Sequence, residues 1–408
     1  MPLGMSCLNK LQVKESSLMI DLAKLREDTP GVLDHVHFNN AGSSLPPRPV
    51  LDRVIEHLKL EARIGGYEAA DVVDEEAQQF YSKAARFIHA QSPHEIAFTQ
   101  SSTASFHALI SAIPLCAKDR VIIFQHEYAS NYLTLLHLQK KLGFSLDVIP
   151  LDCSGDIDLD VLRQKMHRNV KVVVLDHMPT QSGALSPAEE VGAIVKAFDA
   201  VYILDATQTI GQYPVNVHKI GCDALCATSR KFLRGPRGCG FLYVKESLAN
   251  NLIPAVVDLE SAHLVGQGQL CIAPGCKRFE TWERSLALQL GLQQALIYAQ
   301  NVGIDAIWQR GQQLAARMRQ GLASIPGVVV HDPGSRLGNI VTFTKSSHTC
   351  SEMVRHLAAS NIAINMSKKS YAWLDFEQRN LEQVCRASPH YYNSEEEVDI
   401  FLDVLRKL

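Results

Sequence analysis

Lys231 stands where the sequence gathers its most reactive side chains. Two apolar runs typical of strands, 223–227 and 241–244, flank it, and a glycine-rich turn over 235–240 follows it. Because both flanks favour burial, we expect the ammonium to be partly desolvated, which lowers its pKa and makes the amine a usable nucleophile. The alternative is a loop lysine whose stem covers apolar surface while its charge reaches water. These two interpretations of Lys231 are distinguished by whether the rest of the chain supplies a matching cofactor site.

Asp205 is the clearest partner for this lysine. It ends the apolar run 202–204, where a carboxylate is costly to bury unless it faces a cation or a hydrogen-bond donor. The protonated ring nitrogen of pyridoxal phosphate is such a cation, and keeping it protonated makes the ring an electron sink. The alternative is an N-cap aspartate at the start of a helix. Gln208 is close enough in sequence to reach the ring hydroxyl oxygen.

Several hydroxyls and one arginine are suited to a phosphate group. Ser102 and Thr103 lie at a predicted strand-to-helix turn, where free N–H groups and hydroxyls bind phosphate, although plain helix capping explains them equally. Thr228 and Arg230 would add a hydroxyl and a charge-assisted contact to the same phosphate. Tyr128 follows another strand and is expected either to stack on the cofactor ring or to pack as a half-buried tyrosine.

The segments that must position these residues alternate between strands and helices. Strands are predicted, with helices between them, at 95–99, 120–124, 145–150, 171–176 and 200–205. This alternation indicates an α/β fold with a mostly parallel sheet, helices on both faces and ligands beyond the carboxyl ends of the strands. After about residue 250 the pattern changes to long helices at 280–301 and 304–325, short strands and a closing helix at 395–408. We interpret this part as a smaller α+β domain.

Three regions are therefore expected along the chain. Residues 1–34 would be a leader and a helix packing on the small domain, 35–270 the large cofactor-binding domain, and 271–408 the small C-terminal domain. The first 17 residues lack the uninterrupted apolar core of a secretion signal. No apolar run reaches transmembrane length.

Composition narrows the class of protein. The chain has 408 residues, 46% of them hydrophobic and 20% charged, with a formal net charge of −3, which suits a soluble enzyme. This charge balance argues against nucleic acid or a membrane as the main partner. The ten cysteines are scattered and several lie in apolar runs, so we expect buried free thiols in a reducing cytoplasm. Their spacing does not predict a metal site.

Together these motifs resemble the class V aminotransferase family of pyridoxal-phosphate enzymes, which has the fold type I architecture. The resemblance rests on Asp205 and Gln208 followed by Lys231 and its glycine-rich turn, and it extends from about Phe38 to the C terminus. It implies that Lys231 is the covalent anchor of pyridoxal 5'-phosphate and that Asp205 is the partner of the ring nitrogen. Gln208 and Thr180 then fall near the ring hydroxyl.

The resemblance also implies a substrate site. Arg386 matches the arginine that holds the α-carboxylate of an amino-acid substrate, and a guanidinium fork suits that task. Asn40 is a second candidate substrate contact. Tyr128 takes a ring-stacking position that is usually histidine. The family further implies a homodimer with the cofactor near the interface.

The reaction is predicted from local similarities. Segments 65–70 and 229–238 are similar to bacterial hercynylcysteine sulfoxide lyases and, more loosely, to isopenicillin-N-epimerase-like proteins. Ser370 lies near where cysteine desulfurases carry a sulfur-accepting cysteine; because serine cannot form a persulfide, a desulfurase is disfavoured. We therefore expect a carbon–sulfur β-lyase that acts on a cysteine S-conjugate or its sulfoxide and gives pyruvate and ammonia, with Lys231 as the base. A transaminase or an epimerase is the alternative, since both begin with loss of the same α-proton.

Substrate specificity is expected to reside in loops rather than in the predicted strands and helices. The segments in question are 39–47, 256–274 and 365–374. The last two are long and polar enough to act as mobile lids over the site.

Overall fold

A seven-stranded sheet forms the centre of the larger part of the molecule. The computed structural model describes residues 20–408. The strands are β2 (Ile96–Thr99), β3 (Arg120–Phe124), β4 (Ser145–Ile149), β5 (Val170–Asp176), β6 (Val201–Asp205), β7 (Ala224–Thr228) and β8 (Gly240–Val244). Their order is β2-β8-β7-β6-β5-β3-β4, and only β8 runs against its neighbours. The predicted mostly parallel sheet is confirmed.

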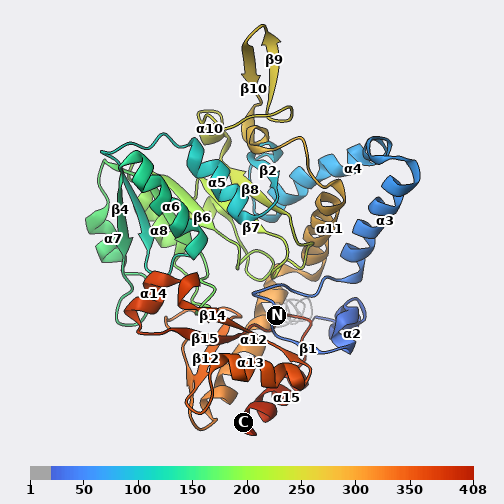
Figure 1. Cartoon of the computed structure of the whole chain (residues 1–408), viewed down its shortest axis with the longest axis vertical. Helices are drawn as coiled ribbons and strands as arrows, with labels where there is room; N and C mark the ends of the chain where they lie inside the picture. The colour runs from blue at the N-terminus through green and yellow to red at the C-terminus, as the bar shows by residue number, and fades with distance from the viewer. Residues whose placement is uncertain (1–19) are drawn as a thin grey trace, which may run out of the picture.

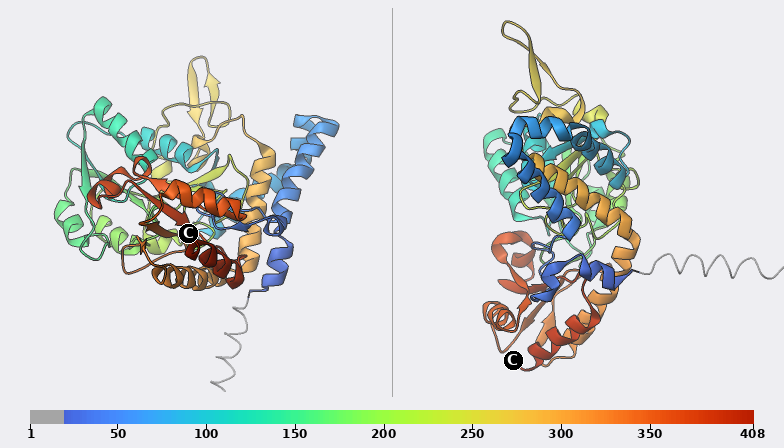
Figure 2. Two further views of the ribbon diagram at one scale, coloured as in Figure 1. Left: turned by 60° about the horizontal axis from the view of Figure 1, so that its bottom comes forward. Right: turned by 90° about the vertical axis from the view of Figure 1, so that its right-hand side faces the viewer.

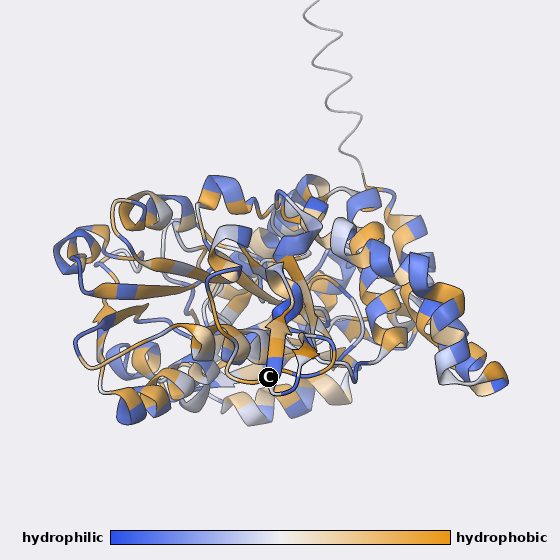
Figure 3. Cartoon of the chain, turned by 90° about the horizontal axis from the view of Figure 1, so that it is seen from above, coloured by the Kyte–Doolittle hydropathy of each residue, from blue (hydrophilic) through white to orange (hydrophobic). Residues whose placement is uncertain are grey.

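Helices cover both faces of this sheet (Figure 1). They are α5 (Ser102–Ala112), α6 (Ala129–Leu142), α7 (Leu159–Lys165), α8 (Ala188–Val195), α9 (Val217–Ile220) and α10 (Glu246–Ala249). Successive residues of β5 point to opposite faces, so Val173 belongs to the apolar core shared with α7 and α8, and Val174 to the core shared with α5 and α6. Because both faces are covered, most residues of the strands are apolar, and the hydrophobic colour predominates along them (Figure 3).

Three long helices pack side by side at one end of the sheet. They are α3 (Arg48–Ile64), α4 (Gly66–Phe87) and α11 (Leu286–Val302). The junction between α3 and α4 is a single residue, Gly65, whose φ of +100° is accessible to glycine. Helix α11 begins later than residue 280 because the Glu280 side chain turns into the core and accepts a hydrogen bond from Phe98 N at 2.6 Å.

The C-terminal part of the chain builds a second, antiparallel sheet of order β11-β12-β15-β14. Its strands are β11 (Val328–Val330), β12 (Val341–Lys345), β14 (Asn365–Lys368) and β15 (Gln383–Ala387). The helices around it are α12 (Ile304–Ala323), α13 (Cys350–Ala359), α14 (Trp373–Gln378) and α15 (Glu395–Arg406). Helices α12, α13 and α15 share one apolar core with this sheet. The smaller α+β part that the sequence predicts is thus present.

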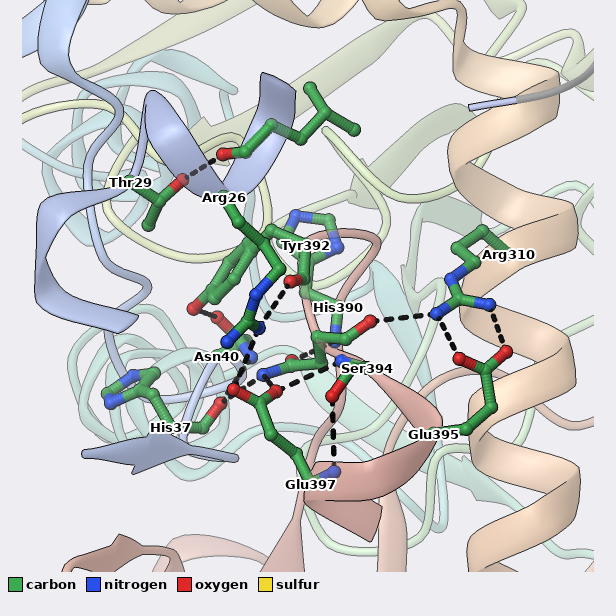
Figure 4. A network of polar contacts seen from close by, with 12 residues as sticks. Arg26, Thr29, His37, Asn40, Arg310, His390, Tyr392, Ser394, Glu395 and Glu397 are labelled. Carbon is green, nitrogen blue, oxygen red and sulfur yellow. Dashed lines mark hydrogen bonds and ion pairs between the residues drawn. The ribbon is translucent and has the colours of Figure 1, made fainter. Parts of the chain in front are cut away.

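The first described residues lie with this C-terminal part. Helix α2 (Leu22–Glu27) is followed by β1 (Val36–His37), which pairs in parallel with β13 (Ile362–Ala363). The Arg26 guanidinium donates to Glu397 Oε1 at 2.8 Å and to the Tyr392 carbonyl at 3.2 Å (Figure 4). The predicted leader, 1–17, lies outside the described residues. The boundaries at 34 and 270 remain predictions.

A two-stranded hairpin extends away from the body of the molecule (Figures 1 and 2). It consists of β9 (Ala262–Gly266) and β10 (Gln269–Ile272), within the segment 256–274 that the sequence suggested as a loop. All nine cysteines of residues 20–408 are free, and Cys116, Cys153 and Cys271 are exposed while the others are buried. Among the helices that the structure describes, none combines the length and the hydropathy needed to cross a membrane.

Candidate active site

Two adjoining cavities lie beyond the carboxyl ends of the parallel strands, between the two sheets. The inner cavity, of about 210 Å³, is lined by the ends of β5, β6 and β7 and the start of α5. The outer cavity, of about 300 Å³, lies between the Lys231 loop and strands β14 and β15. Both share Tyr128, Thr180, Arg230 and Lys231 in their walls. Of the residues predicted for the site, all but Asn40 line one cavity or both.

Lys231 is buried, with 7% of its surface exposed. Burial, together with the charges of the neighbouring guanidinium groups of Arg230 and Arg386, lowers the pKa of Lys231 to about 7. Its Nζ lies 5.9 Å from the centroid of the Tyr128 ring. At neutral pH a large fraction of this lysine is therefore a free amine, as a nucleophile or base requires.

The loop that carries Lys231 is held from several sides. Arg234 is almost fully buried at a φ of +62°, and its guanidinium donates to the Leu45 carbonyl at 2.8 Å and to the Tyr391 hydroxyl at 2.7 Å. Gly211 packs against this loop at a φ of +91°. A Cβ at that position would lie 2.3 Å from Leu233 N. Close packing of two turns therefore fixes where the amine points.

Asp205 has both carboxylate oxygens engaged. Oδ1 accepts from Thr207 N at 3.0 Å, and Oδ2 accepts from the Asn131 amide at 3.0 Å. Asp176 ends the neighbouring strand, directly beside Asp205 in the register. Burial, together with the charges of Asp205 and Glu127, raises the pKa of Asp176 well above its usual range. An oriented carboxylate at this depth suits a buried cation such as a pyridinium nitrogen.

Gln208 and Thr180 lie together on the wall of the inner cavity. Gln208 Nε2 donates to Thr180 Oγ1 at 3.0 Å and to the Ala41 carbonyl at 3.2 Å. Gln208 Oε1 is buried without a hydrogen-bond partner among the described residues. Because buried polar atoms are almost always paired, this oxygen indicates that a further polar group belongs in the cavity.

The start of α5 supplies the predicted phosphate contacts. Ser101 caps the helix by accepting from Ala104 N at 3.1 Å, so Ser102 and Thr103 stand in its first turn, where backbone N–H groups are free. Thr228 and Arg230 line the same cavity, as does Arg237, which was not predicted. These hydroxyl, N–H and guanidinium donors match the phosphate of pyridoxal phosphate. The carboxylate of Asp205 matches its ring nitrogen, and the amine of Lys231 matches its aldehyde.

Arg386 stands in the outer cavity on strand β15. Its Nη1 contacts the Thr180 hydroxyl, and its buried Nε has no partner among the described residues. Burial lowers the pKa of Arg386 to about 10, so the guanidinium remains charged at neutral pH. A buried cation with an unpaired donor favours a carboxylate ligand.

Asn40 differs from its prediction as a substrate contact. It is fully buried, and its Nδ2 donates to the Ser388 carbonyl at 2.7 Å. Its Oδ1 accepts from the Tyr392 hydroxyl at 2.6 Å (Figure 4). Because its amide is already paired on both sides, Asn40 joins the N-terminal segment to the chain after β15. The next residues, Ala41 and Gly42, line the outer cavity instead.

Sequence reasoning missed several residues of the two cavities. Asp176 ends an apolar strand as Asp205 does, so the same pattern would have found it. Asn131 lies on a helix and carries no such signal. Lys368 and Tyr371 line the outer cavity, whereas the neighbouring Ser370 is exposed and does not line it.

Comparison with known proteins places this site in a family. The family model for Aminotransferase class-V matches residues 36–401. A probable cysteine desulfurase of Pyrococcus abyssi is 26% identical over 413 residues, which cover 94% of this chain and 96% of that protein. The apo structure of a cysteine desulfurase from Thermococcus onnurineus superposes with a TM-score of 0.89 at 25% identity, covering 95% of this chain and 98% of that one. A C-DES variant with glycine covalently linked to its PLP cofactor has a TM-score of 0.85 at 20% identity, covering 94% and 99% of the two chains, and shows the shared fold.

These relatives overturn the predicted reaction. The predicted likeness to hercynylcysteine sulfoxide lyases and isopenicillin-N-epimerase-like proteins is wrong, as is the expected β-elimination on a cysteine S-conjugate or its sulfoxide, since the matched relatives are cysteine desulfurases. The prediction drawn from Ser370, that a desulfurase is disfavoured, is therefore also wrong. The coarser prediction of a pyridoxal-phosphate enzyme of carbon–sulfur lyase type agrees with these relatives. The motif at 65–70 forms the exposed junction of α3 and α4 and lines neither cavity.

Proposed function

The chain belongs to the class V aminotransferase family of pyridoxal-phosphate enzymes, and from this premise we propose that it removes sulfur from L-cysteine. The observation that supports this proposal is the arrangement of three groups around one pair of cavities. They are the buried amine of Lys231, the oriented carboxylate of Asp205 and the partly unpaired guanidinium of Arg386. The cysteine desulfurases among its relatives give the proposed substrate.

Each residue has a distinct proposed task. Pyridoxal phosphate, when bound, supplies the electron sink that allows bonds near the α-carbon of an amino acid to break. Asp205 keeps the ring nitrogen protonated, while Arg386 orients the α-carboxylate of the substrate. Lys231 anchors the cofactor and, once released, accepts the α-proton with its amine, whose pKa of about 7 suits work at neutral pH.

The phosphate would be held at the opposite end of the inner cavity. Ser102, Thr103 and Thr228 offer hydroxyls, and Arg230 offers a charged donor. The Tyr128 ring, 5.9 Å from Lys231 Nζ, would cover one face of the ring system and exclude water from it. Gln208 and Thr180 are proposed to contact the ring hydroxyl.

The purified holoenzyme with L-cysteine and an added thiol acceptor provides the test. The thiol is added because no cysteine is among the described residues that line the two cavities. We expect alanine to form in step with sulfide or persulfide. Lys231→Ala should abolish both products, while Lys245→Ala, an exposed lysine beyond the site, should retain them. Formation of pyruvate in place of alanine, or no turnover of L-cysteine, would contradict the proposal.

A further inference from the structure

A second buried carboxyl group lies behind Asp205. Glu127 directly precedes the Tyr128 that faces Lys231, and only 2% of its surface is exposed. Asn131, one turn into α6, donates from its Nδ2 to Glu127 Oε1 at 2.9 Å and to Asp205 Oδ2 at 3.0 Å. Glu127 Oε1 also accepts from Tyr128 N at 3.0 Å. A continuous hydrogen-bonded path thus connects Glu127 to the carboxylate of Asp205.

The charges in this region favour one protonation state. Asp176 from β5 and Asp205 from β6 are the acidic groups that face Glu127. The positive charge of Lys231 acts on Asp176 and lowers its pKa. Three buried carboxyl groups this close do not all ionise together. Burial raises the pKa of Glu127 to about 8, and the charge of Asp205 contributes in the same direction. At neutral pH Glu127 is therefore mostly the uncharged acid.

The hydrogen-bond geometry agrees with an uncharged Glu127. Its Oε1 accepts two hydrogen bonds, as the carbonyl oxygen of a carboxylic acid does, whereas its Oε2 has no acceptor or donor partner among residues 20–408. No lysine or arginine of the described residues forms an ion pair with it. Without a cation to pair with, the uncharged acid costs less to bury than the carboxylate.

We propose that Glu127 is a positioning residue for Asp205, which fixes the Asp205 carboxylate through Asn131 and, as a neutral acid, leaves the negative charge of the cluster where the cofactor nitrogen needs it. This inference concerns cofactor binding and the electronic state of the ring. It rests on the proposed roles of Asp205 and of the cavity, and it does not depend on which amino acid is turned over.

Two isosteric substitutions separate this role from simple packing. Glu127→Gln keeps an oxygen acceptor and resembles the neutral acid. The affinity for pyridoxal phosphate should therefore stay within about threefold of wild type. The visible absorbance of the bound cofactor at pH 7 should not shift. Asn131→Asp removes the amide donor and adds a negative charge beside Asp205. We expect it to weaken cofactor affinity by about 10- to 100-fold, as for loss of a hydrogen bond to a charged group, and to change the absorbance.

The experiment compares holoenzyme and apoprotein forms of both variants with Glu75→Gln, an exposed glutamate of α4, as the control. Spectrophotometric titration of the apoprotein with pyridoxal phosphate gives the affinity, and circular dichroism verifies folding. Infrared difference spectra between wild type and Glu127→Gln should contain the carbonyl stretch of a protonated carboxylic acid at pH 7. If Asn131→Asp fails to fold, Asn131→Ser, which keeps one donor, should give an intermediate affinity.

Three results would overturn the proposal. They are unchanged affinity and absorbance in a folded Asn131→Asp protein, a loss in Glu127→Gln as large as in Asn131→Asp, or no infrared band assigned to Glu127. None of these measurements uses a substrate. Failure of the L-cysteine assay would therefore leave this test intact, and the two outcomes are distinguishable.

Discussion

At the scale of single residues, the site depends on an amine whose pKa lies near neutral pH. Lys231 has a pKa of about 7 in the folded chain, against the ordinary 10.5. Between these two values the unfolded chain binds a proton that the folded apoprotein does not, so the free energy of unfolding rises with pH across this window. Burial of the lysine costs most at and below pH 7, where the amine must be charged.

Lys231→Met tests this linkage. Between pH 7 and 10, the free energy of unfolding of the wild-type apoprotein should rise by about 1 kcal/mol per pH unit. The variant should lack this rise, because methionine fills the space without titrating. Urea unfolding at several pH values gives the comparison, and Lys245→Met serves as the exposed control. Parallel pH profiles of wild type and Lys231→Met would refute the lowered pKa.

Arg386 is expected to control substrate binding through its guanidinium fork. Arg386→Lys keeps the charge but loses the planar pair of donors, so kcat/KM for L-cysteine should fall by about 10- to 100-fold, mainly through KM. Cofactor absorbance should be unaffected, because Arg386 lines the outer cavity and not the inner one. Steady-state kinetics measure the effect, and a decrease in kcat alone would argue for a different role.

Sequence reasoning found the residues of the site that disturb a local pattern. Lys231 interrupts two apolar runs and Asp205 ends one, and buried charge in such places is unusual enough to suggest chemistry. Asn131 could not be found in this way. It contacts Asp205 from 74 residues away, and one amide on an ordinary helix has no sequence feature that reports such a contact.

At the scale of elements, the turn after β6 and the loop after β7 must fit closely together. Gly211→Ala places a methyl group 2.3 Å from Leu233 N at a φ that favours glycine, so we expect a loss of about 2–4 kcal/mol in the free energy of unfolding. Gly221→Ala is the matched control. Its φ of +72° is also left-handed, but no atom lies within 4 Å, so it should cost only about 1 kcal/mol. Equal costs measured by chemical denaturation would show that strain, rather than the close approach, dominates.

The alternation of strands and helices was sufficient to predict the central sheet, because buried strands leave long apolar runs in the sequence. The β9–β10 hairpin was not predicted, since its side chains have no core to face and its sequence shows no pattern of burial. Leu264 and Leu270 are exposed there. Likewise, the start of α11 was misplaced because Glu280 is drawn into a contact with β2, which is distant in sequence.

At the scale of the whole molecule, one ion pair joins the first described helix to the last. Arg26 and Glu397 are 2.8 Å apart, and their side chains are 29% and 7% exposed. We expect a double-mutant cycle with Arg26→Met and Glu397→Gln to give a coupling of about 1–3 kcal/mol. The exposed pair Arg163–Asp160 should give about 0.5 kcal/mol or less. Thermal or urea unfolding measures both cycles, and equal couplings would contradict a structural role for the buried pair.

The pairing of β1 with β13 also has a consequence for how the chain is made. Val36 leaves the ribosome well before Ile362, its partner in the strand pair. The contact of Asn40 with Ser388 spans 348 residues. The segment that contains β1 must therefore remain unpaired while the large sheet forms, because contacts this distant in sequence form slowly. Synthesis of β13 and of the segment after β15, rather than folding of the first helices, thus sets when the two walls of the cleft can meet.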